Sequence, residues 1–237
     1  MTVNAEIICV GTELLLGQIT NTNARFLSER LAELGIDVYY QTTVGDNRKR
    51  LLEAFKIASA RSQLVISTGG LGPTDDDLTK ETLAEFLGLK LEISAAEEDK
   101  LKQYFAGRNL KWVPSNAKQA AFLPGAHILT NLAGTAPGMA YRHGDCSYIV
   151  LPGPPKEMQT MFAGYAVPWI RENLISSEIL PLFSHVLKFT GISESMLEDI
   201  LKDLISGQSI PTIAPLVSDG EIHLRLTARS RSEEEFK

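Results

Sequence analysis

The stretch STGGLGPTDDDLTKE, residues 67–81, brings turn-forming glycines together with three consecutive aspartates. Gly69, Gly70 and Gly72 allow backbone N–H groups to approach a ligand closely, and the N-terminus of the helix expected after them favours phosphate. The loop matches neither the G-x-G-x-x-G fingerprint nor the Walker pattern, which disfavours NAD binding and kinase-like nucleotide binding. It therefore indicates a phosphate site of another kind.

Acidic side chains are expected both within this loop and on the loops beside it. Asp75, Asp76 and Asp77 are expected to begin a helix, where carboxylates bond free N–H groups, and such capping alone would account for one or two of them. Glu13 and Asp46 follow other expected strands and so belong to neighbouring loops. Several carboxylates would repel a phosphate unless a divalent cation joined them to it. Such a cation polarises a phosphoryl group and positions water, which suits hydrolysis or transfer at a phosphoanhydride.

The elements that must position these residues alternate between strands and helices in the first part of the chain. Apolar runs at 5–10, 37–44 and 63–68 each precede a helical pattern, as in βαβ units with a parallel sheet. Asp46 is suited to be the N-cap of the second helix. Ligands of an open parallel sheet bind at the carboxyl ends of its strands, so the loops after these runs and the PGPP loop at 152–155 are expected to meet.

The middle of the chain carries further helix and hairpin signals. A capping box beginning at Ser94 predicts one helix, and the stretch 113–122 is expected to be another short helix, capped by Ser115. The runs 138–142 and 146–151 are typical of a hairpin. This hairpin would deliver the chain to the PGPP loop.

After about Trp169 the pattern changes to strand, helix, strand and strand, which predicts a small separate α+β unit. We therefore expect one domain at 1–170 and a second at 171–237. The last residues, 230–237, start like a capped helix but leave no room to complete it. This ending indicates a fragment of a longer protein.

Composition and charge exclude several classes of protein. The 237 residues are 44% hydrophobic and 22% charged, as in a soluble globular protein. A formal net charge of -6, without a cluster of Lys and Arg, disfavours a nucleic-acid partner. No run of about 18 apolar residues indicates a membrane span. Cys9 and Cys146 lie in apolar strand-like runs without metal-ligand spacing, so we expect reduced thiols and a cytoplasmic location.

Five spaced motifs resemble those of the CinA family of competence/damage-inducible proteins. They are VGTELLLGQITNTN, VGDN, STGGLGPTDDDLT, NLAGTAPG and LPGPPKEM, in that order. The resemblance implies an α/β fold with a doubly wound, mostly parallel, molybdopterin-binding-like sheet, followed by a small KH-like α+β unit. The wider superfamily includes MogA and MoeA, whose acidic loop positions correspond to Asp46 and Asp77 here. Those proteins carry a GGTG loop ending in Arg-Asp where this chain has GGLGPTDDD.

The CinA resemblance implies a metal-dependent ADP-ribose pyrophosphatase, a hydrolase that cleaves ADP-ribose to AMP and ribose 5-phosphate. Catalysis would then fall to Asp46 and Asp77, and a divalent cation, Mg²⁺ or a transition metal, would be held by Asp46, Asp76 and Asp77. The alternative is a molybdopterin-binding or adenylyl-transfer protein of the MogA/MoeA type, because both substrates contain an adenylyl pyrophosphate. A module for DNA transactions is disfavoured by the charge.

The family resemblance also bears on assembly and on the substrate contacts. By analogy we expect a homodimer, and a nicotinamide mononucleotide deamidase domain of full-length relatives is expected beyond residue 237. Asn116 and Gln119 are spaced to share one helix face, which suits an exposed polar face as well as a ligand contact. The motifs imply substrate-binding roles for Thr12, Glu13, Asn23, Gly69, Gly70, Gly72, Pro73, Thr74, Asn116, Gln119, Asn131, Gly134, Thr135, Pro152, Gly153 and Pro154.

Overall fold

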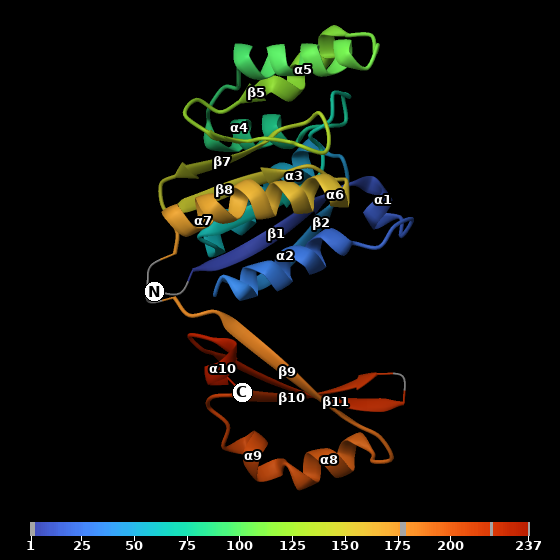
Figure 1. The fold of residues 1–237 in the computed structure, drawn as a ribbon, viewed down its shortest axis with the longest axis vertical. Coiled ribbons are helices and arrows are strands. Elements are labelled where there is room, and N and C mark those ends of the chain that lie inside the picture. The colour runs from blue at the N-terminus through green and yellow to red at the C-terminus, as the bar shows by residue number, and fades with distance from the viewer. Residues whose placement is uncertain (1–2, 176–178, 219, 237) are drawn as a thin grey trace. The chain divides into compact units, whose positions relative to one another are not determined.

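The computed structural model describes residues 3–175, 179–218 and 220–236 of the chain. Two compact units are present (Figure 1). Residues 1–31 and 37–176 form the first unit, and residues 32–36 and 177–237 form the second. Among the helices of the described residues, none is both long enough and apolar enough to cross a membrane.

A six-stranded sheet forms the centre of the first unit (Figure 1), with the strand order β2-β1-β3-β8-β7-β6. Strands β1, β2, β3 and β8 are parallel, whereas β7 and β6 run antiparallel to their neighbours. This confirms the predicted mostly parallel α/β sheet and the hairpin at its far side. The bounds are β1 (Asn4–Val10), β2 (Asp37–Val44), β3 (Leu64–Thr68), β6 (His127–Leu129), β7 (Gly138–His143) and β8 (Cys146–Leu151).

Helices cover both faces of this sheet. On one face, Ile8 of β1 belongs to a buried cluster with apolar residues of α3 and α4, such as Phe55 and Leu83. On the other face, Phe26 of α2 contacts Phe162, which follows α6, with ring centroids 6.2 Å apart. The bounds are α1 (Thr12–Leu15), α2 (Thr22–Glu33), α3 (Arg48–Arg61), α4 (Thr79–Leu87), α6 (Pro155–Met161), a π-helical segment (Phe162–Ala166) and α7 (Val167–Asn173).

A smaller substructure is inserted between α4 and β6. It consists of β4 (Glu92–Ile93), α5 (Ala95–Gly107), a 3₁₀ helix (Pro114–Ala120) and β5 (Ala121–Phe122). The Ser94 hydroxyl accepts a hydrogen bond from the Glu97 N–H, which confirms the predicted cap. The expected cap at Ser115 is wrong, because the 3₁₀ helix begins one residue earlier, at Pro114, without a side-chain cap. Asn116 and Gln119 are both buried, so they do not form an exposed polar face.

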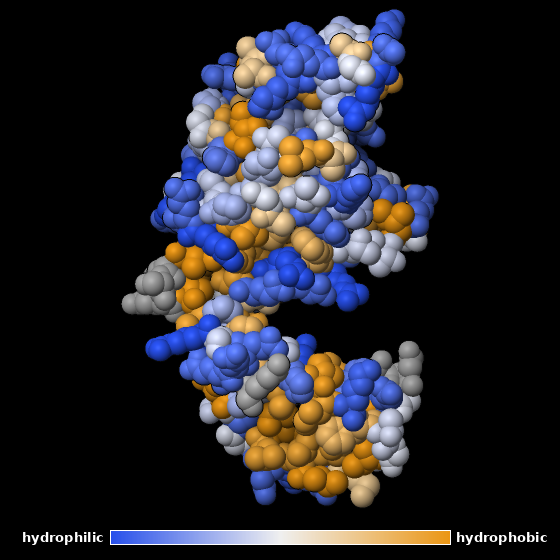
Figure 2. Space-filling view, in the orientation of Figure 1, coloured by the Kyte–Doolittle hydropathy of each residue, from blue (hydrophilic) through white to orange (hydrophobic). Residues whose placement is uncertain are grey.

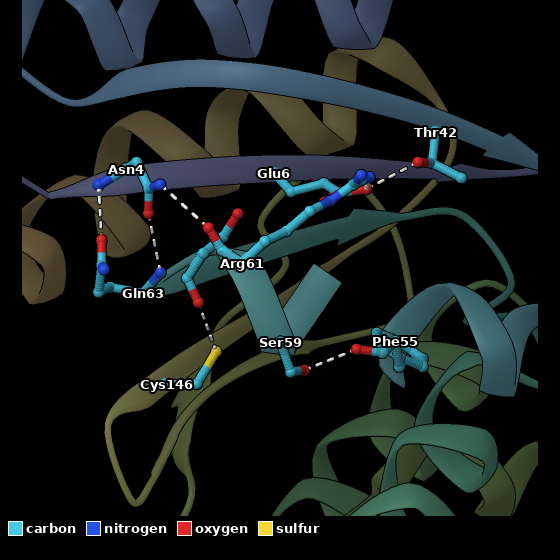
Figure 3. A network of polar contacts seen from close by, with 9 residues as sticks. Asn4, Glu6, Thr42, Phe55, Ser59, Arg61, Gln63 and Cys146 are labelled. Atoms are coloured by element: carbon cyan, nitrogen blue, oxygen red, sulfur yellow. Dashed lines mark hydrogen bonds and ion pairs between the residues drawn. The ribbon is translucent and has the colours of Figure 1, made fainter. Parts of the chain in front are cut away.

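An ion pair between a buried glutamate and a more exposed arginine joins the sheet to α3 (Figure 3). The Glu6 side chain on β1 is 1% exposed, and Arg61 at the end of α3 donates to both of its carboxylate oxygens, at 2.8 and 2.9 Å. The Thr42 hydroxyl on β2 donates to the same carboxylate at 2.7 Å. Hydrogen bonding to Glu6 raises the pKa of Arg61. Nearby, Asn4 and Gln63 exchange two hydrogen bonds between backbone N–H groups and side-chain oxygens. These contacts fix β1, β2 and the start of β3 to one another.

The second unit is a three-stranded antiparallel sheet in the order β10-β11-β9, with short helices. Figure 2 shows apolar side chains gathered on one face of this unit. Its exposed apolar residues include Met196, Ile200 and Leu204. The bounds are β9 (Leu182–Phe189), α8 (Glu194–Ile200), α9 (Lys202–Ser206), β10 (Thr212–Ser218), β11 (Glu221–Arg229) and α10 (Glu233–Phe236).

Candidate functional site

The loops after the four parallel strands line one cavity of about 420 Å³ in the first unit. Parallel strands end at the same edge of a sheet, so the residues that follow β1, β2, β3 and β8 are brought together there. The cavity contains most of the residues that the sequence predicts for the site: Glu13, Asp46, Gly69, Gly70, Gly72, Pro73, Thr74, Asp76, Asp77, Gln119, Thr135, Pro152, Gly153 and Pro154.

The glycine loop takes a path that only glycine allows at Gly69 and Gly70. Gly69 and Gly70 have φ angles of 107° and 66°, in the left-handed region that favours glycine. A Cβ atom on Gly69 would lie 2.1 Å from the carbonyl oxygen of Val10 at the end of β1. The Thr79 hydroxyl, at the start of α4, donates to the Gly69 carbonyl at 2.7 Å. The loop is therefore fixed between β1 and α4 while its outer side faces the cavity.

The aspartate run precedes α4 and does not begin it, so the expected helix start at Asp75–Asp77 is wrong. The helix starts at Thr79, and the aspartates form a turn organised by Thr74. Asp77 Oδ2 accepts from the Thr74 N–H at 3.0 Å, and the Thr74 hydroxyl contacts both Asp76 and Asp77. This hydroxyl lowers the pKa of Asp76. A Cβ atom on Gly72 would lie 2.3 Å from Asp77 Oδ2, so the glycine makes room for that carboxylate.

Asp46 faces the cavity because it is not the helix cap that its position after β2 predicts. The cap of α3 is Asn47, whose Oδ1 accepts from the Arg50 N–H at 3.1 Å. Asp46 Oδ2 instead accepts from the Thr12 N–H at 2.9 Å and from the Thr12 hydroxyl at 2.7 Å. Thr12 thus orients Asp46 and does not itself line the cavity.

Four other predicted substrate contacts do not line this cavity either. Asn23 donates to the Thr68 hydroxyl and to the Gly153 carbonyl, at 3.0 and 2.7 Å, and so joins α2 to the PGPP loop. Asn131 bonds the backbone of its own loop. The remaining two are Asn116, which is buried, and Gly134, which lines a separate cavity of about 120 Å³. The structure gives Asn23 and Asn131 the role of holding loops in place.

Gln119 is a buried amide on the wall of the main cavity. Its side chain is 3% exposed, and its Nε2 donates to the Thr135 hydroxyl at 3.2 Å. Its Oε1 has no hydrogen-bond partner among the described residues. A buried polar atom without a partner is costly, so this oxygen suits a donor group of a ligand.

Lys80 is a buried cation that sequence reasoning missed. Its Nζ donates to the Gln119 carbonyl at 2.9 Å and lies 4.1 Å from the centre of the Phe122 ring. It therefore fixes the 3₁₀ helix that carries Gln119 to the first turn of α4. The only signal in the sequence is that this lysine stands among the apolar positions of α4.

We expect Lys80→Met to remove a pH dependence of stability. Burial lowers the pKa of Lys80 from the ordinary 10.5 to about 7. Between these values the unfolded state binds more protons than the folded state, so the free energy of unfolding rises with pH, by up to about 1.4 kcal/mol per pH unit. Below about pH 7 both states are protonated and this dependence ends.

Chemical denaturation of wild type and Lys80→Met between about pH 7 and 8.5 measures this effect. At higher pH the Cys9 thiol, whose pKa is raised by burial, adds an opposite dependence. Lys90→Met, at an exposed position, is the control and should keep the wild-type slope. Equal slopes for wild type and Lys80→Met would show that Lys80 keeps its proton when folded.

Glu157 lines the main cavity and, like Lys80, was missed by sequence reasoning. It lies in the first turn of α6. Asn131 Nδ2 donates to its Oε2 at 2.6 Å. The motif LPGPPKEM contains this glutamate, but the sequence alone does not indicate which side of the helix faces the other loops.

The acidic side chains suit a cation shared with a substrate better than an enclosed metal centre. In the part of the chain that the structure describes, no three acidic, histidine or cysteine side chains form a group that could hold a metal ion. Asp46 and Asp77 both accept their hydrogen bonds through Oδ2. Their other oxygens remain for a ligand. Mg²⁺ typically takes one or two protein carboxylates and completes its shell with water and substrate phosphates. A cation held by Asp46, Asp76 and Asp77 therefore stays a prediction.

Comparison with known protein families defines the class of the first unit. The family described as "Probable molybdopterin binding domain" matches residues 6–172. The family described as "Damage-inducible protein CinA KH domain" matches residues 184–237. The first unit, with its parallel sheet and its cavity at the strand ends, is therefore a domain of the molybdopterin-binding class.

Similar proteins narrow the assignment, and the chain belongs to the CinA family. A putative competence-damage inducible protein of Geobacillus sp. (strain WCH70) is 56% identical over 99% of this chain, and one of Lysinibacillus sphaericus (strain C3-41) is 50% identical over 98%. The matches cover 56% and 55% of those proteins, so the chain spans about half the length of these relatives. The crystal structure of CinA, of unknown function, from Thermoplasma acidophilum has a TM-score of 0.64 and 35% identity, covering 73% of this chain and 99% of that one.

Proposed function

We propose that the chain hydrolyses the pyrophosphate bond of ADP-ribose, or of a related nucleoside diphosphate sugar, in a reaction that requires a divalent cation. AMP and ribose 5-phosphate are the products from ADP-ribose. The observation that supports this most directly is one cavity of about 420 Å³ faced both by the glycine loop and by carboxylates from several strand ends. Its volume suits a small-molecule ligand, for which roughly 300–1,000 Å³ is typical.

The residues that line the cavity would have separate roles in this reaction. The glycine loop brings backbone N–H groups close to phosphate oxygens, and Gln119 offers an unpartnered oxygen to a hydroxyl or amino group of the substrate. Asp46 and Asp77 are the residues that would hold the cation, with Asp76 beside them. When bound, the cation neutralises charge on the pyrophosphate and makes its phosphorus more electrophilic. Thr12 and Thr74 keep the two aspartates oriented.

Molybdopterin binding or adenylyl transfer is the second candidate. It is favoured by the description of the family that matches residues 6–172. The same cavity would serve either ligand class, because an adenylylated molybdopterin also contains a pyrophosphate. The homodimer, the lack of a nucleic-acid partner and the cytoplasmic location expected from the sequence stay predictions.

Two parallel assays separate the candidates. Purified protein is incubated with ADP-ribose and a panel of divalent cations, and AMP is quantified by chromatography. The same preparation is incubated with molybdopterin, ATP and the same cations, and adenylylated molybdopterin is quantified. AMP release that stops when EDTA is added supports the hydrolase, whereas adenylylated molybdopterin without AMP release from ADP-ribose would replace it with the second candidate.

A further inference from the structure

The Glu157 carboxylate is held in one orientation by the loop opposite it. Asn131 Oδ1 accepts from the N–H groups of Ala133 and Gly134, at 3.0 and 2.8 Å. This leaves the amide nitrogen of Asn131 to donate to the Ala136 carbonyl at 3.0 Å and to Glu157 Oε2 at 2.6 Å. Because two backbone donors fix the amide orientation, Glu157 is bonded by an N–H group and not by an oxygen.

Gly134 adds a steric constraint to the same carboxylate. A Cβ atom at this position would lie 2.1 Å from Glu157 Oε2 and 2.6 Å from Oε1, so the carboxylate occupies the space that a side chain would fill. Among the described residues, no lysine or arginine forms an ion pair with Glu157. The loop therefore presents an oriented carboxylate to the cavity without neutralising it.

The sheet separates Glu157 from the aspartate that would hold the cation. In the strand order β2-β1-β3-β8, Asp46 follows β2 and Glu157 follows β8. Three strand spacings separate these ends, or roughly 14 Å. The glycine loop follows β3 and lies between them. A pyrophosphate on this loop would have Asp46 on one side and Glu157 on the other.

In-line displacement at phosphorus places the attacking and leaving oxygens on opposite sides. A cation at Asp46 and Asp77 would offset the charge that develops on the leaving phosphate. The attacking water would then approach from the β8 side, where Glu157 presents its carboxylate. Glu13 also lines the cavity, but it follows β1, next to β2, and so lies toward the leaving side.

We propose that Glu157 is the general base of the reaction, a role that rests on the proposed hydrolysis of ADP-ribose. The water oxygen forms a bond to one phosphorus as its proton passes to the Glu157 carboxylate. The bridging P–O bond breaks, and its electron pair stays on the departing phosphate. Glu157 then releases the proton to solvent, so that water and ADP-ribose give AMP and ribose 5-phosphate. Asn131 and Gly134 are positioning residues that aim this base.

The test compares Glu157→Gln with wild type for AMP release from ADP-ribose in the presence of Mg²⁺. We expect kcat to fall by about 100-fold, as for loss of a general base, with KM within about threefold of the wild-type value. Calorimetry with ADP-ribose and Ca²⁺ in place of Mg²⁺ should give similar affinities for both proteins. The fall of kcat/KM at low pH that belongs to this base should disappear in Glu157→Gln. Glu53→Gln, at an exposed position outside the site, is the control for folding and handling.

Two further variants separate a base from a structural carboxylate. Glu157→Ala should regain part of its activity when formate is added, because a free carboxylate can replace a base but not a packing contact. Gly134→Ala keeps the Glu157 carboxylate but displaces it, and so should also lower kcat. If wild type releases AMP and Glu157→Gln keeps more than about a third of its kcat, the base is another residue and the proposed function stands. If wild type releases no AMP with any cation, both proposals fall.

Discussion

Replacing Asp77 by asparagine is expected to lower cation-dependent AMP release from ADP-ribose by about 100- to 1000-fold while the protein stays folded. Asparagine keeps the shape of the side chain and can still accept from the Thr74 N–H, which bonds Asp77 at 3.0 Å. The helix does not depend on the lost charge, because α4 begins two residues later, at Thr79. What the substitution removes is one negative charge that would face the proposed cation.

The measurement is AMP release over a range of Mg²⁺ concentrations, beside thermal unfolding, for Asp77→Asn, Asp46→Asn and the double variant. If both aspartates act through one cation, the double variant should lose much less activity than the product of the two single losses. Gly72→Ala should also lower turnover, since its Cβ would displace the Asp77 carboxylate without changing the charge. Asp145→Asn, in the exposed turn between β7 and β8, is the matched control. Wild-type turnover in Asp77→Asn would move the cation site away from the aspartate turn.

Gly69→Ala is expected to lower the free energy of unfolding by about 3–5 kcal/mol, the sum of overpacking and backbone strain. The clash is with backbone, the Val10 carbonyl oxygen 2.1 Å away, so a change of rotamer cannot relieve it. The φ angle of 107° adds strain for any residue with a Cβ. Relief would require the end of β1 to move away from β3, which would also open the cavity.

Chemical denaturation measures this loss, with Gly144→Ala as the control. Gly144 also has a positive φ, 57°, but a Cβ there would meet no atom within 4 Å. This control therefore contains the milder strain of a left-handed position without the clash, and should cost about 1 kcal/mol. Equal losses for the two variants would mean that β1 yields to the added methyl group.

Much of the fold could be predicted because its signals are local. The cap at Ser94 and the hairpin at 138–143 and 146–151 depend on residues within a few positions of one another. The alternation of strands and helices predicts the parallel sheet, and the sheet in turn brings the loops to one edge. For this reason, Asp46, the glycine loop and the PGPP loop could be predicted to share a site before any geometry was known.

The errors arise where two local solutions compete. Asp46 and Asn47 are both good N-caps, and Asn47 takes the role because Thr12, 34 residues away, bonds Asp46 instead. The aspartate run looks like a helix start, yet Thr74 folds it into a turn first. A tertiary contact decides the first choice and a side-chain bond within the loop decides the second. Neither can be read from propensity.

The roles of Lys80 and Glu157 could not be predicted because their environment comes from distant parts of the chain. Lys80 shares helical spacing with Leu83 and Leu87, but only the 3₁₀ helix and Phe122 reveal it as a buried donor. Glu157 becomes an oriented carboxylate through Asn131, 26 residues earlier in the chain. Burial and long-range hydrogen bonds of this kind are properties of the folded chain.

Glu6 lies in the amino-terminal half of β1, so its ion pair with Arg61 of α3 is away from the carboxyl edge of the sheet, which lines the cavity. Substitutions at this amino edge can therefore change the stability of the protein without changing the residues that line the cavity at the carboxyl edge. Relatives from hot and cold habitats are expected to vary around Asn4, Glu6 and Gln63, where a changed ion pair or hydrogen bond shifts the melting temperature alone. For protein engineering, this makes the amino edge the place to add heat tolerance while substrate preference is altered separately at the carboxyl edge.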